Sequence, residues 1–319
     1  MKSLSAVKAN SGTAGSSEKH GFWATLKKYY AFYLMLIPGI LYFAIFKYGP
    51  MWGIVIAFQN YNPFQGVLGS KFVGLDHFVR FLKSPECGML FRNTLLLAVY
   101  NLVFYFPLPI IIALMLNEVG NKWFQKIVQS LIYIPHFISW VVVVGLCYIM
   151  FNNQNGSVTT LYHELTGGQL NLLMSAKAFR PMVVVQMMWK EAGWGTIIFL
   201  AALAGVDVQL YEAAYIDGAT NFQRLWHITL PSIRSTIVTM FILRLGKFMD
   251  TGFDQIYNLL NAMNRDVGEV FDTYIYQLGM VSGQYSYSTA VGLFKSVIAL
   301  VLVIVTDHLS KKIGEEGVF

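Results

Sequence analysis

Charged residues are scarce in this 319-residue chain: Asp, Glu, Lys and Arg together make up 13% of it, whereas an average soluble domain has about a quarter. Cysteine is almost absent. Cys87 and Cys147 stand too far apart in sequence for a zinc or redox motif. These shortages exclude an ordinary cytosolic enzyme, a disordered scaffold and a secreted module held together by disulfides.

Motifs that carry chemistry are also missing. The only Gly-Lys pair resembling a phosphate loop, Gly246-Lys247, is followed by Phe248, so no G-x-x-x-x-G-K-[ST] loop is present. The six histidines include no H-E-x-x-H pair, and no G-x-S-x-G elbow occurs. The chain has a net charge of +6, but it contains no cluster of basic residues interleaved with aromatic ones. Nucleic acid is therefore not an expected partner. We expect a non-enzymatic chain that binds no cofactor or metal itself.

Long apolar runs are what the chain does have. Hydrophobic residues make up 55% and the mean hydropathy is +0.52. A helix needs about 20 apolar residues to cross a bilayer, and six segments qualify. They predict an all-α polytopic membrane protein with spans at about 30–58, 93–116, 128–151, 181–204, 233–257 and 287–308. The first span is interrupted by prolines and is expected to continue as a bent interfacial piece. Residues 259–285 are predicted to form a loop with a short helix.

The ends of the chain are polar and basic. Residues 1–28 lack the apolar core of a signal peptide and are interpreted as a flexible cytoplasmic tail before a transmembrane domain at 29–319. Lys and Arg are modestly enriched in the segments that lie on the same side as the N-terminus. Because such residues favour the cytoplasmic side, both termini are predicted to be cytoplasmic.

The segment 211–235, YEAAYIDGATNFQRLWHITLPSIRS, lies between the fourth and fifth predicted spans. Its alanines allow close backbone approach, Gly218 permits a bend that a Cβ would hinder, and Pro231 ends one helix or begins the next. From these properties alone, the segment could be an amphipathic connection of no special function.

Nevertheless, it resembles the EAA loop of binding-protein-dependent ABC importer permeases, whose pattern is roughly E-A-A-x-x-D-G-A followed by I-x-L-P. The matching positions are Glu212, Ala213, Ala214, Asp217, Gly218, Ala219, Ile228, Leu230 and Pro231. Ser235 departs from the pattern, because many members have a second proline there.

The resemblance implies a type I ABC importer permease fold in a bacterial plasma (inner) membrane. The loop at 208–231 would form a coupling helix seated in a groove of a cytoplasmic ATPase dimer, which would hold ATP and Mg²⁺. Glu212 would pair with a basic group of the ATPase, Ala213 and Ala214 would allow close seating, and Gly218 would supply the bend. Further implied partners are a second, homologous permease and an extracytoplasmic solute-binding protein.

A second resemblance lies near the N-terminus, in Phe46-Lys47-Tyr48-Gly49-Pro50-Met51 and Ala57-Phe58-Gln59-Asn60-Tyr61-Asn62-Pro63. These runs are similar to permeases of polysaccharide and aldouronate uptake systems. The resemblance implies an oligosaccharide substrate, expected to contain uronic acids as in fragments of alginate, pectin or xylan.

Charged residues inside the predicted spans give independent information. Lys190, Arg244, Lys247 and Lys295 fall near span centres, where each cation costs about 2.5–3.5 kcal/mol if it faces lipid. They must therefore face a carboxylate, a watery cavity or a partner. The candidate substrate path consists of Trp189, Lys190, Glu191, Trp194, Arg244, Lys247 and Asp250, with Arg244, Lys247, Asp250 and Asp254 expected on one helical face.

Three interpretations of these charges stay open: internal ion pairs such as Lys247 with Asp250, a cationic and aromatic path for an acidic oligosaccharide, and contact with the second permease. The loops at 59–92, 152–180 and 258–286 are either solvated connections or docking sites for the binding protein. Two other functions remain as alternatives. One is an ion-coupled secondary carrier, although no internal repeat is visible, and the other is a membrane-anchored assembly protein.

Overall fold

The computed structural model describes residues 27–312 of the chain, with the side chains of residues 309, 310 and 312 left out. Most of the expected tail at 1–28 therefore lies outside the described residues, and its last two positions, Lys27 and Lys28, are helical. The chain divides into two units, residues 1–53 and residues 54–319.

The first unit contains one long helical run with no buried residue along α2. Its segments are α2 (Tyr30–Phe43), the π-helix η1 (Ala44–Tyr48) and α3 (Gly49–Met51), and the 3₁₀ helix η2 (Trp52–Phe58) continues it across the boundary. The run Tyr30–Phe58 is helical throughout, with α, π and 3₁₀ segments in succession. A helix that is apolar on every side is stable only within lipid or protein.

The second unit begins with a short hairpin and a surface helix. Strands β1 (Gln59–Asn60) and β2 (Lys71–Phe72) pair antiparallel, with Gln59 opposite Phe72. They flank α4 (Gly66–Gly69) and are followed by α5 (Asp76–Lys83).

The second expected span is longer than its apolar run. Helix α6 (Pro85–Tyr100), the π-helix η3 (Asn101–Tyr105) and α7 (Pro107–Asn117) form one continuous helix. It begins eight residues before the predicted 93 because Pro85 occupies the first turn, where proline is well tolerated. Apolar content alone does not detect this polar first turn.

The third expected span, 128–151, is not one straight helix. Helix α8 (Lys122–Tyr133) and the 3₁₀ turn η4 (Ile134–Phe137) meet α9 (Trp140–Phe151) at 97°. Pro135 lies in the first turn of η4, and Ser139 caps α9 by accepting a hydrogen bond from the Val142 amide at 3.4 Å. A proline and an N-cap within five residues end one helix and start another. Beyond α9 lies α10 (Ser157–Thr166).

The fourth expected span, 181–204, falls within α11 (Ala176–Ala204), a 29-residue helix that follows the N-cap Ser175. It turns by 69° into α12 (Val208–Ile216). There follow α13 (Asn221–Arg224), the π-helix η5 (Leu225–Thr229), α14 (Leu230–Ser232) and α15 (Arg234–Gly246).

The fifth expected span, 233–257, is wrong at its C-terminal end. Helix α15 stops at Gly246 and α16 (Phe253–Leu259) starts only after Gly252, whose φ is +85°. Glycine at position 252 permits this break, because only glycine readily adopts positive φ. Arg244, Lys247, Asp250 and Asp254 therefore do not share one helical face.

The remaining elements are several short helices, where one was expected, followed by a long helix at the sixth expected span. They are α17 (Arg265–Gly268), α18 (Phe271–Tyr276), the π-helix η6 (Gln277–Val281) and α19 (Tyr285–Lys312). By length and composition, the described residues contain three continuous helices able to cross a membrane, and up to six crossings if each bent pair counts as one.

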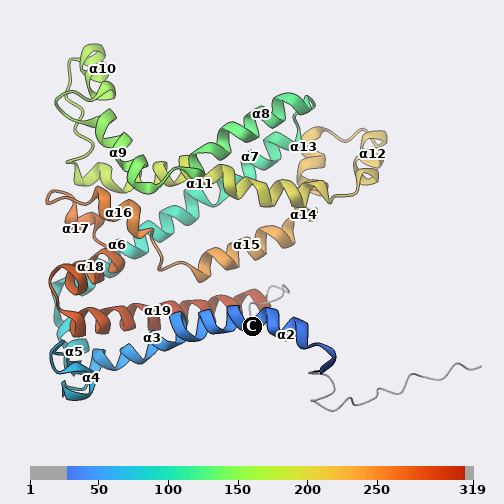
Figure 1. Cartoon of the computed structure of the whole chain (residues 1–319). Coiled ribbons are helices and arrows are strands. Elements are labelled where there is room, and N and C mark those ends of the chain that lie inside the picture. Colours follow the sequence, from blue (N-terminus) through green and yellow to red (C-terminus); the bar gives the residue numbers. More distant parts are fainter. Residues whose placement is uncertain (1–26, 313–319) are drawn as a thin grey trace, which may run out of the picture. The chain divides into compact units, whose positions relative to one another are not determined.

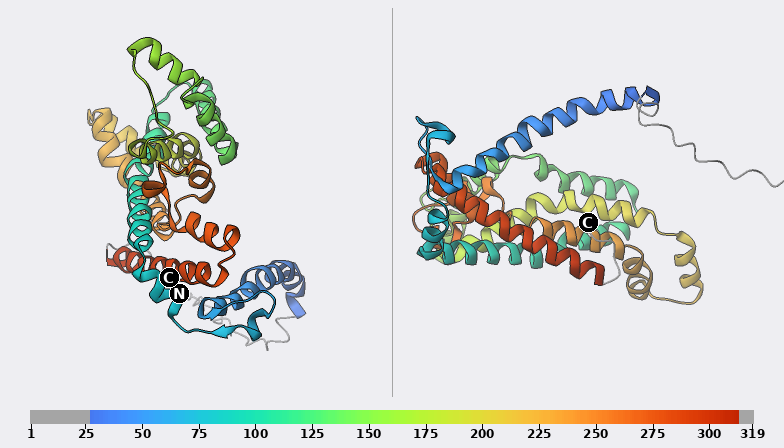
Figure 2. Two further views of the ribbon diagram at one scale, coloured as in Figure 1. Left: turned by 90° about the vertical axis from the view of Figure 1, so that its left-hand side faces the viewer. Right: turned by 90° about the horizontal axis from the view of Figure 1, so that it is seen from below.

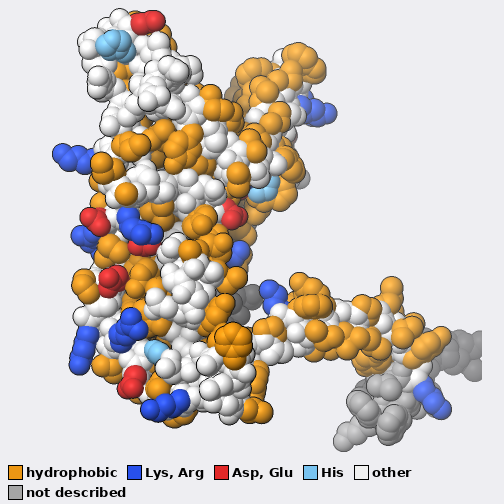
Figure 3. All heavy atoms as spheres, turned by 60° about the vertical axis from the view of Figure 1, so that its left-hand side comes forward, with side chains coloured by type: hydrophobic (Ala, Val, Ile, Leu, Met, Phe, Trp, Pro, Cys, Tyr) orange, Lys and Arg blue, Asp and Glu red, His pale blue; other side chains and the backbone are white. Residues whose placement is uncertain are grey.

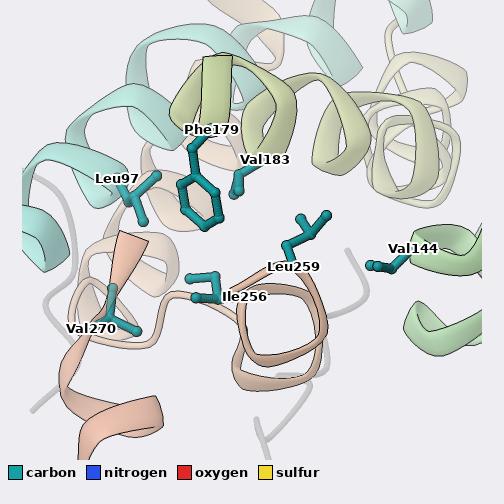
Figure 4. Close-up of a cluster of buried hydrophobic side chains, with 7 residues drawn as sticks. All are labelled: Leu97, Val144, Phe179, Val183, Ile256, Leu259 and Val270. Carbon is teal, nitrogen blue, oxygen red and sulfur yellow. The ribbon is translucent and has the colours of Figure 1, made fainter. Parts of the chain in front are cut away.

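Three clusters of buried side chains hold the second unit together. One joins α6, α9, α11 and α16 through seven residues (Figure 4): Leu97, Val144, Phe179, Val183, Ile256, Leu259 and Val270. A second joins α5, α6, α18 and α19 around Phe81 and Phe271, and a third joins α7, α11 and α15 around Phe199 and Ile233.

The two ends of this unit differ. The α7–α8 turn, the α12–α14 segment and the C-terminal end of α19 lie at one end, and α5, α10 and α16–α18 lie at the other (Figure 1). A view from below shows α12 and α13 projecting beyond the ends of α11 and α15 (Figure 2). The opposite end presents Lys, Arg, Asp and Glu side chains among neutral ones (Figure 3).

Candidate functional site

The segment α12–α14 is built from strong local stop and start signals. Asp207 caps α12 by accepting a hydrogen bond from the Gln209 amide at 2.9 Å. At the other end, Gly218 has φ +74°, the Ala219 amide donates to the Ala214 carbonyl at 2.9 Å, and the Gly218 amide donates to Tyr215 at 3.1 Å. These two bonds form a Schellman motif, which ends the helix with a glycine in the left-handed region.

A second helix starts at once. The Thr220 hydroxyl accepts from the Gln223 amide at 3.3 Å, and the Thr220 amide donates to the Gln223 side chain at 2.8 Å. This capping box satisfies two amides of the first turn of α13. The Tyr211 and Thr229 hydroxyls then hydrogen-bond at 3.0 Å and join α12 to η5. The segment is therefore a braced helix–turn–helix.

The surface of this segment is unusually apolar for a protruding loop. Tyr215, Ile216, Phe222 and Trp226 are all exposed, Ile216 to 83%, and the rings of Phe222 and Trp226 stack 6.3 Å apart. Glu212 is also exposed. Exposed apolar side chains in such number indicate a contact surface for another protein or a membrane. We name Tyr215, Ile216, Phe222, Trp226 and Glu212 the loop face.

Within α11, the expected charged and aromatic residues separate into different environments. Lys190 is 5% exposed, and its ammonium donates to the His136 carbonyl at 2.7 Å and to Glu191 at 3.0 Å. The other oxygen of Glu191 contacts Nδ1 of His136 at 2.7 Å. The Lys190 ammonium also lies 5.2 Å from the Trp140 ring centre. The charge on Lys190 is thus compensated internally.

Trp194 is the link from this cluster to a second group. Its ring stacks on the His136 ring at 4.4 Å with 5° between the planes. It also lines a cavity of about 220 Å³ with Tyr105, Arg244 and Lys247. The Arg244 guanidinium lies 5.2 Å from the Tyr105 ring centre, in the range of a cation–π contact. We name Tyr105, Trp194, Arg244 and Lys247 the cationic cavity.

Two candidate path residues lie elsewhere. Trp189 lines an apolar cavity between α9 and α11. Asp250 lines a cavity of about 670 Å³ that also contains Asp272 and Lys295, and these last two form an ion pair. Within residues 27–312 no ion pair joins Lys247 to Asp250. Of the four cations of the predicted spans, Lys190 pairs with Glu191 and Lys295 pairs with Asp272.

Sequence reasoning missed His136, Tyr105, Trp140 and Asp272. Each is far in sequence from the charge that it contacts, so no motif or helical spacing connects them. One signal was available: a buried cation requires a partner, and Asp272 is one of the few carboxylates of the 259–285 loop.

The chain is also similar to proteins of known family and structure. Residues 105–315 match the family model of binding-protein-dependent transport system inner membrane components. The chain is 51% identical to Protein LplB of Bacillus subtilis, over 93% of each chain. It is 52% identical to the polygalacturonan/rhamnogalacturonan transport system permease protein YteP of the same organism, over 90% of this chain and 89% of that one.

A solved structure also superposes closely. It is a chain of a bacterial alginate ABC transporter, crystallised with an alginate pentasaccharide-bound periplasmic protein. The TM-score is 0.86 at 38% identity, covering 93% of this chain and 99% of that chain. The agreement confirms the all-α permease fold of type I importers expected from the sequence.

Proposed function

This chain belongs to the family of binding-protein-dependent transport system inner membrane components, and from this premise we propose that it is one permease subunit of an ATP-driven importer of uronate-containing oligosaccharides. A separate ATPase dimer holding ATP and Mg²⁺ drives it, a homologous permease completes the pathway, and an extracytoplasmic solute-binding protein delivers the sugar. Both chain termini lie on the ATPase side.

One observation carries the proposal: the two helices that enter the α12–α14 segment also line the cationic cavity. Helix α11 turns directly into α12 and contributes Trp194, and α15 follows α14 and contributes Arg244. The Tyr211–Thr229 hydrogen bond ties the two arms together near the loop. Displacement of the loop face is therefore passed to both walls of the cavity, which is what a rocking transport mechanism needs.

The loop face suits an ATPase groove. Glu212 offers a charge to a basic group, and the half-buried Ala214 and Ala219 keep the turn narrow beside it. Asp217 and Gly218 form the helix end, while Ile228, Leu230 and Pro231 begin the return to α15. Ala213 is exposed and adds no bulk that would hold the partner away.

The cationic cavity suits an acidic sugar. Arg244 is half-buried and Lys247 is exposed, and within the described part of the chain neither forms an ion pair with a carboxylate. A guanidinium binds a carboxylate strongly through paired hydrogen bonds, and the Trp194 ring offers a flat apolar face. The relatives named for polygalacturonan and alginate transport support a uronate substrate. Lys190, whose charge is already paired, holds the α8–α9 bend against α11 instead.

Coupling is tested with the complete importer in proteoliposomes. Glu212→Ala should reduce sugar uptake per ATP hydrolysed, while the binding protein retains its affinity for sugar. The matched control is Glu118→Ala, which removes an exposed glutamate from the α7–α8 turn at the same end of the unit. Unchanged uptake in both variants, or uptake driven by an ion gradient without ATP, would contradict the assigned role.

Substrate charge is tested separately by uptake of two sugars of equal length. Lys247→Gln should raise KM for an oligogalacturonate and leave uptake of a neutral xylo-oligosaccharide unchanged. The control variant is Lys126→Gln, an exposed lysine of α8 outside the cavity. Equal effects on the uptake of the acidic and the neutral sugar would refute the proposal that Lys247 binds the negative charge of the substrate.

A further inference from the structure

An apolar groove runs along the first half of α11, away from the cationic cavity. It has a volume of about 620 Å³ and lies between α11 and the α6–η3 helix. Its walls are formed by Tyr100 and Phe104 on one side and by Pro181, Val184 and Met188 on the other. Groove residues at 181, 184 and 188 recur every three or four positions, so they follow one face of α11.

Cations stand at one end of the groove. Lys177 and Arg180 both line it, and Arg180 donates to the Val267 carbonyl at 3.1 Å and to the Asn93 side chain at 2.8 Å. Arg92 donates to the adjacent Asp266 carbonyl at 3.1 Å. All of these acceptors are neutral oxygens.

The positive charge at this end is therefore not neutralised. Among residues 27–312, no carboxylate lies within ion-pair distance of Arg92, Lys177 or Arg180. The carboxylate of Glu269, which lies in the same loop as Asp266 and Val267, pairs with Arg265 at 3.4 Å. Lys177 is exposed and has room for an anion beside Arg180.

The length of the groove matches one leaflet of a bilayer. From Lys177 to Met188 the helix rises by about 16 Å at 1.5 Å per residue, and half of a typical hydrocarbon core is about 15 Å. With the cations at the level of the headgroups, the apolar walls reach the bilayer centre.

We propose that this groove is a binding site for an anionic phospholipid. One acyl chain lies between Tyr100–Phe104 and the 181–188 face of α11, and the phosphate lies between Lys177 and Arg180. The apolar walls distinguish a lipid from a free anion, and the unpaired cations distinguish an anionic lipid from a zwitterionic one. The site is independent of the transported sugar.

The test is native mass spectrometry of the purified importer complex, titrated with phosphatidylglycerol or phosphatidylcholine of identical chains. We expect tighter binding of phosphatidylglycerol, and Lys177→Gln should weaken it about fivefold, the effect of one cation at a membrane surface. Lys71→Gln removes an exposed lysine from the same end and should leave binding unchanged. Equal affinity for the two lipids, or no effect of Lys177→Gln, would overturn the proposal.

Two further experiments identify which part of the lipid is bound. Met188→Trp fills the inner end of the groove and should weaken binding of phosphatidylglycerol, provided that the variant assembles and elutes as the wild-type complex. Inorganic phosphate or glycerol phosphate at millimolar concentration should not displace the lipid. Full displacement by either, or unchanged binding to Met188→Trp, would show that no acyl chain occupies the groove.

Discussion

Among the glycines of the described residues, Gly193 leaves the least room for a Cβ, and this gives a specific prediction. A Cβ at this position of α11 would lie 1.9 Å from the carbonyl oxygen of Ile132 and 2.5 Å from its carbonyl carbon, both in the α8 backbone. Ordinary contacts begin at 3.4 Å, so in Gly193→Ala the α8 backbone must withdraw by roughly 1.5 Å, because packed interiors have no spare volume.

The energetic effect has two opposing parts. Alanine in place of glycine favours a helix by about 1 kcal/mol, whereas overpacking a core costs about 1–3 kcal/mol or more. The withdrawal also stretches the contact between the Lys190 ammonium and the His136 carbonyl, now 2.7 Å. We expect a net loss of about 2 kcal/mol, which lowers the melting temperature by roughly 4–8 °C at the scale of a large domain.

The assay is thermal unfolding of the purified chain in detergent, followed by tryptophan fluorescence. Gly145→Ala is the matched control, because a Cβ there meets nothing within 4 Å and α9 should gain slightly from alanine. If Gly193→Ala melts at or above the wild-type temperature while Gly145→Ala behaves as expected, the close approach of α8 to α11 is wrong.

Three further predictions concern other parts of the chain. Burial raises the pKa of the Glu269 carboxyl, against the attraction of Arg265; its stabilising contribution is therefore full below the unfolded pKa of about 4.3 and is lost as pH rises through the raised value. Between pH 4 and pH 7, the melting temperature of Glu269→Gln should rise relative to that of the wild type. An unchanged difference between the two melting temperatures would contradict this. Gly218→Ala should lose about 1–2 kcal/mol through backbone strain and Gly218→Asn less, as denaturant titration would show; equal losses would point to another cause. Lys295→Met should destabilise by about 2 kcal/mol because it leaves Asp272 unpaired, and adding Asp272→Asn should restore most of the loss; additive losses in the double variant would exclude the pair.

The helices and the braced loop were predictable because their signals are local. Apolar runs located the six helical regions, and the glycine and proline of the 211–235 segment marked its turns. Gly218 does adopt positive φ, as a helix end before a second helix requires.

The breaks inside the third and fifth predicted spans were not foreseen, although Pro135 and Ser139 mark one and Gly246 and Gly252 the other. Hydropathy averaged over about 20 residues hides single residues that stop a helix. The partners of the buried charges were missed for a different reason. Contacts such as Lys190 with His136, 54 positions apart, depend on how helices pack and leave no trace in spacing.

The four cations of the predicted spans lie in different environments. Facing lipid, together they would cost roughly 10–14 kcal/mol. Lys190 and Lys295 avoid this cost by pairing with Glu191 and Asp272, so they present little net charge to a passing solute. Arg244 rests over an aromatic ring instead, and Lys247 stands exposed just beyond the end of α15. Cation–π contact leaves the positive charge in place, so these two residues retain an attraction for anions. The acidic substrate is proposed at Arg244 and Lys247 because the other two cations already have their counter-ions within the chain.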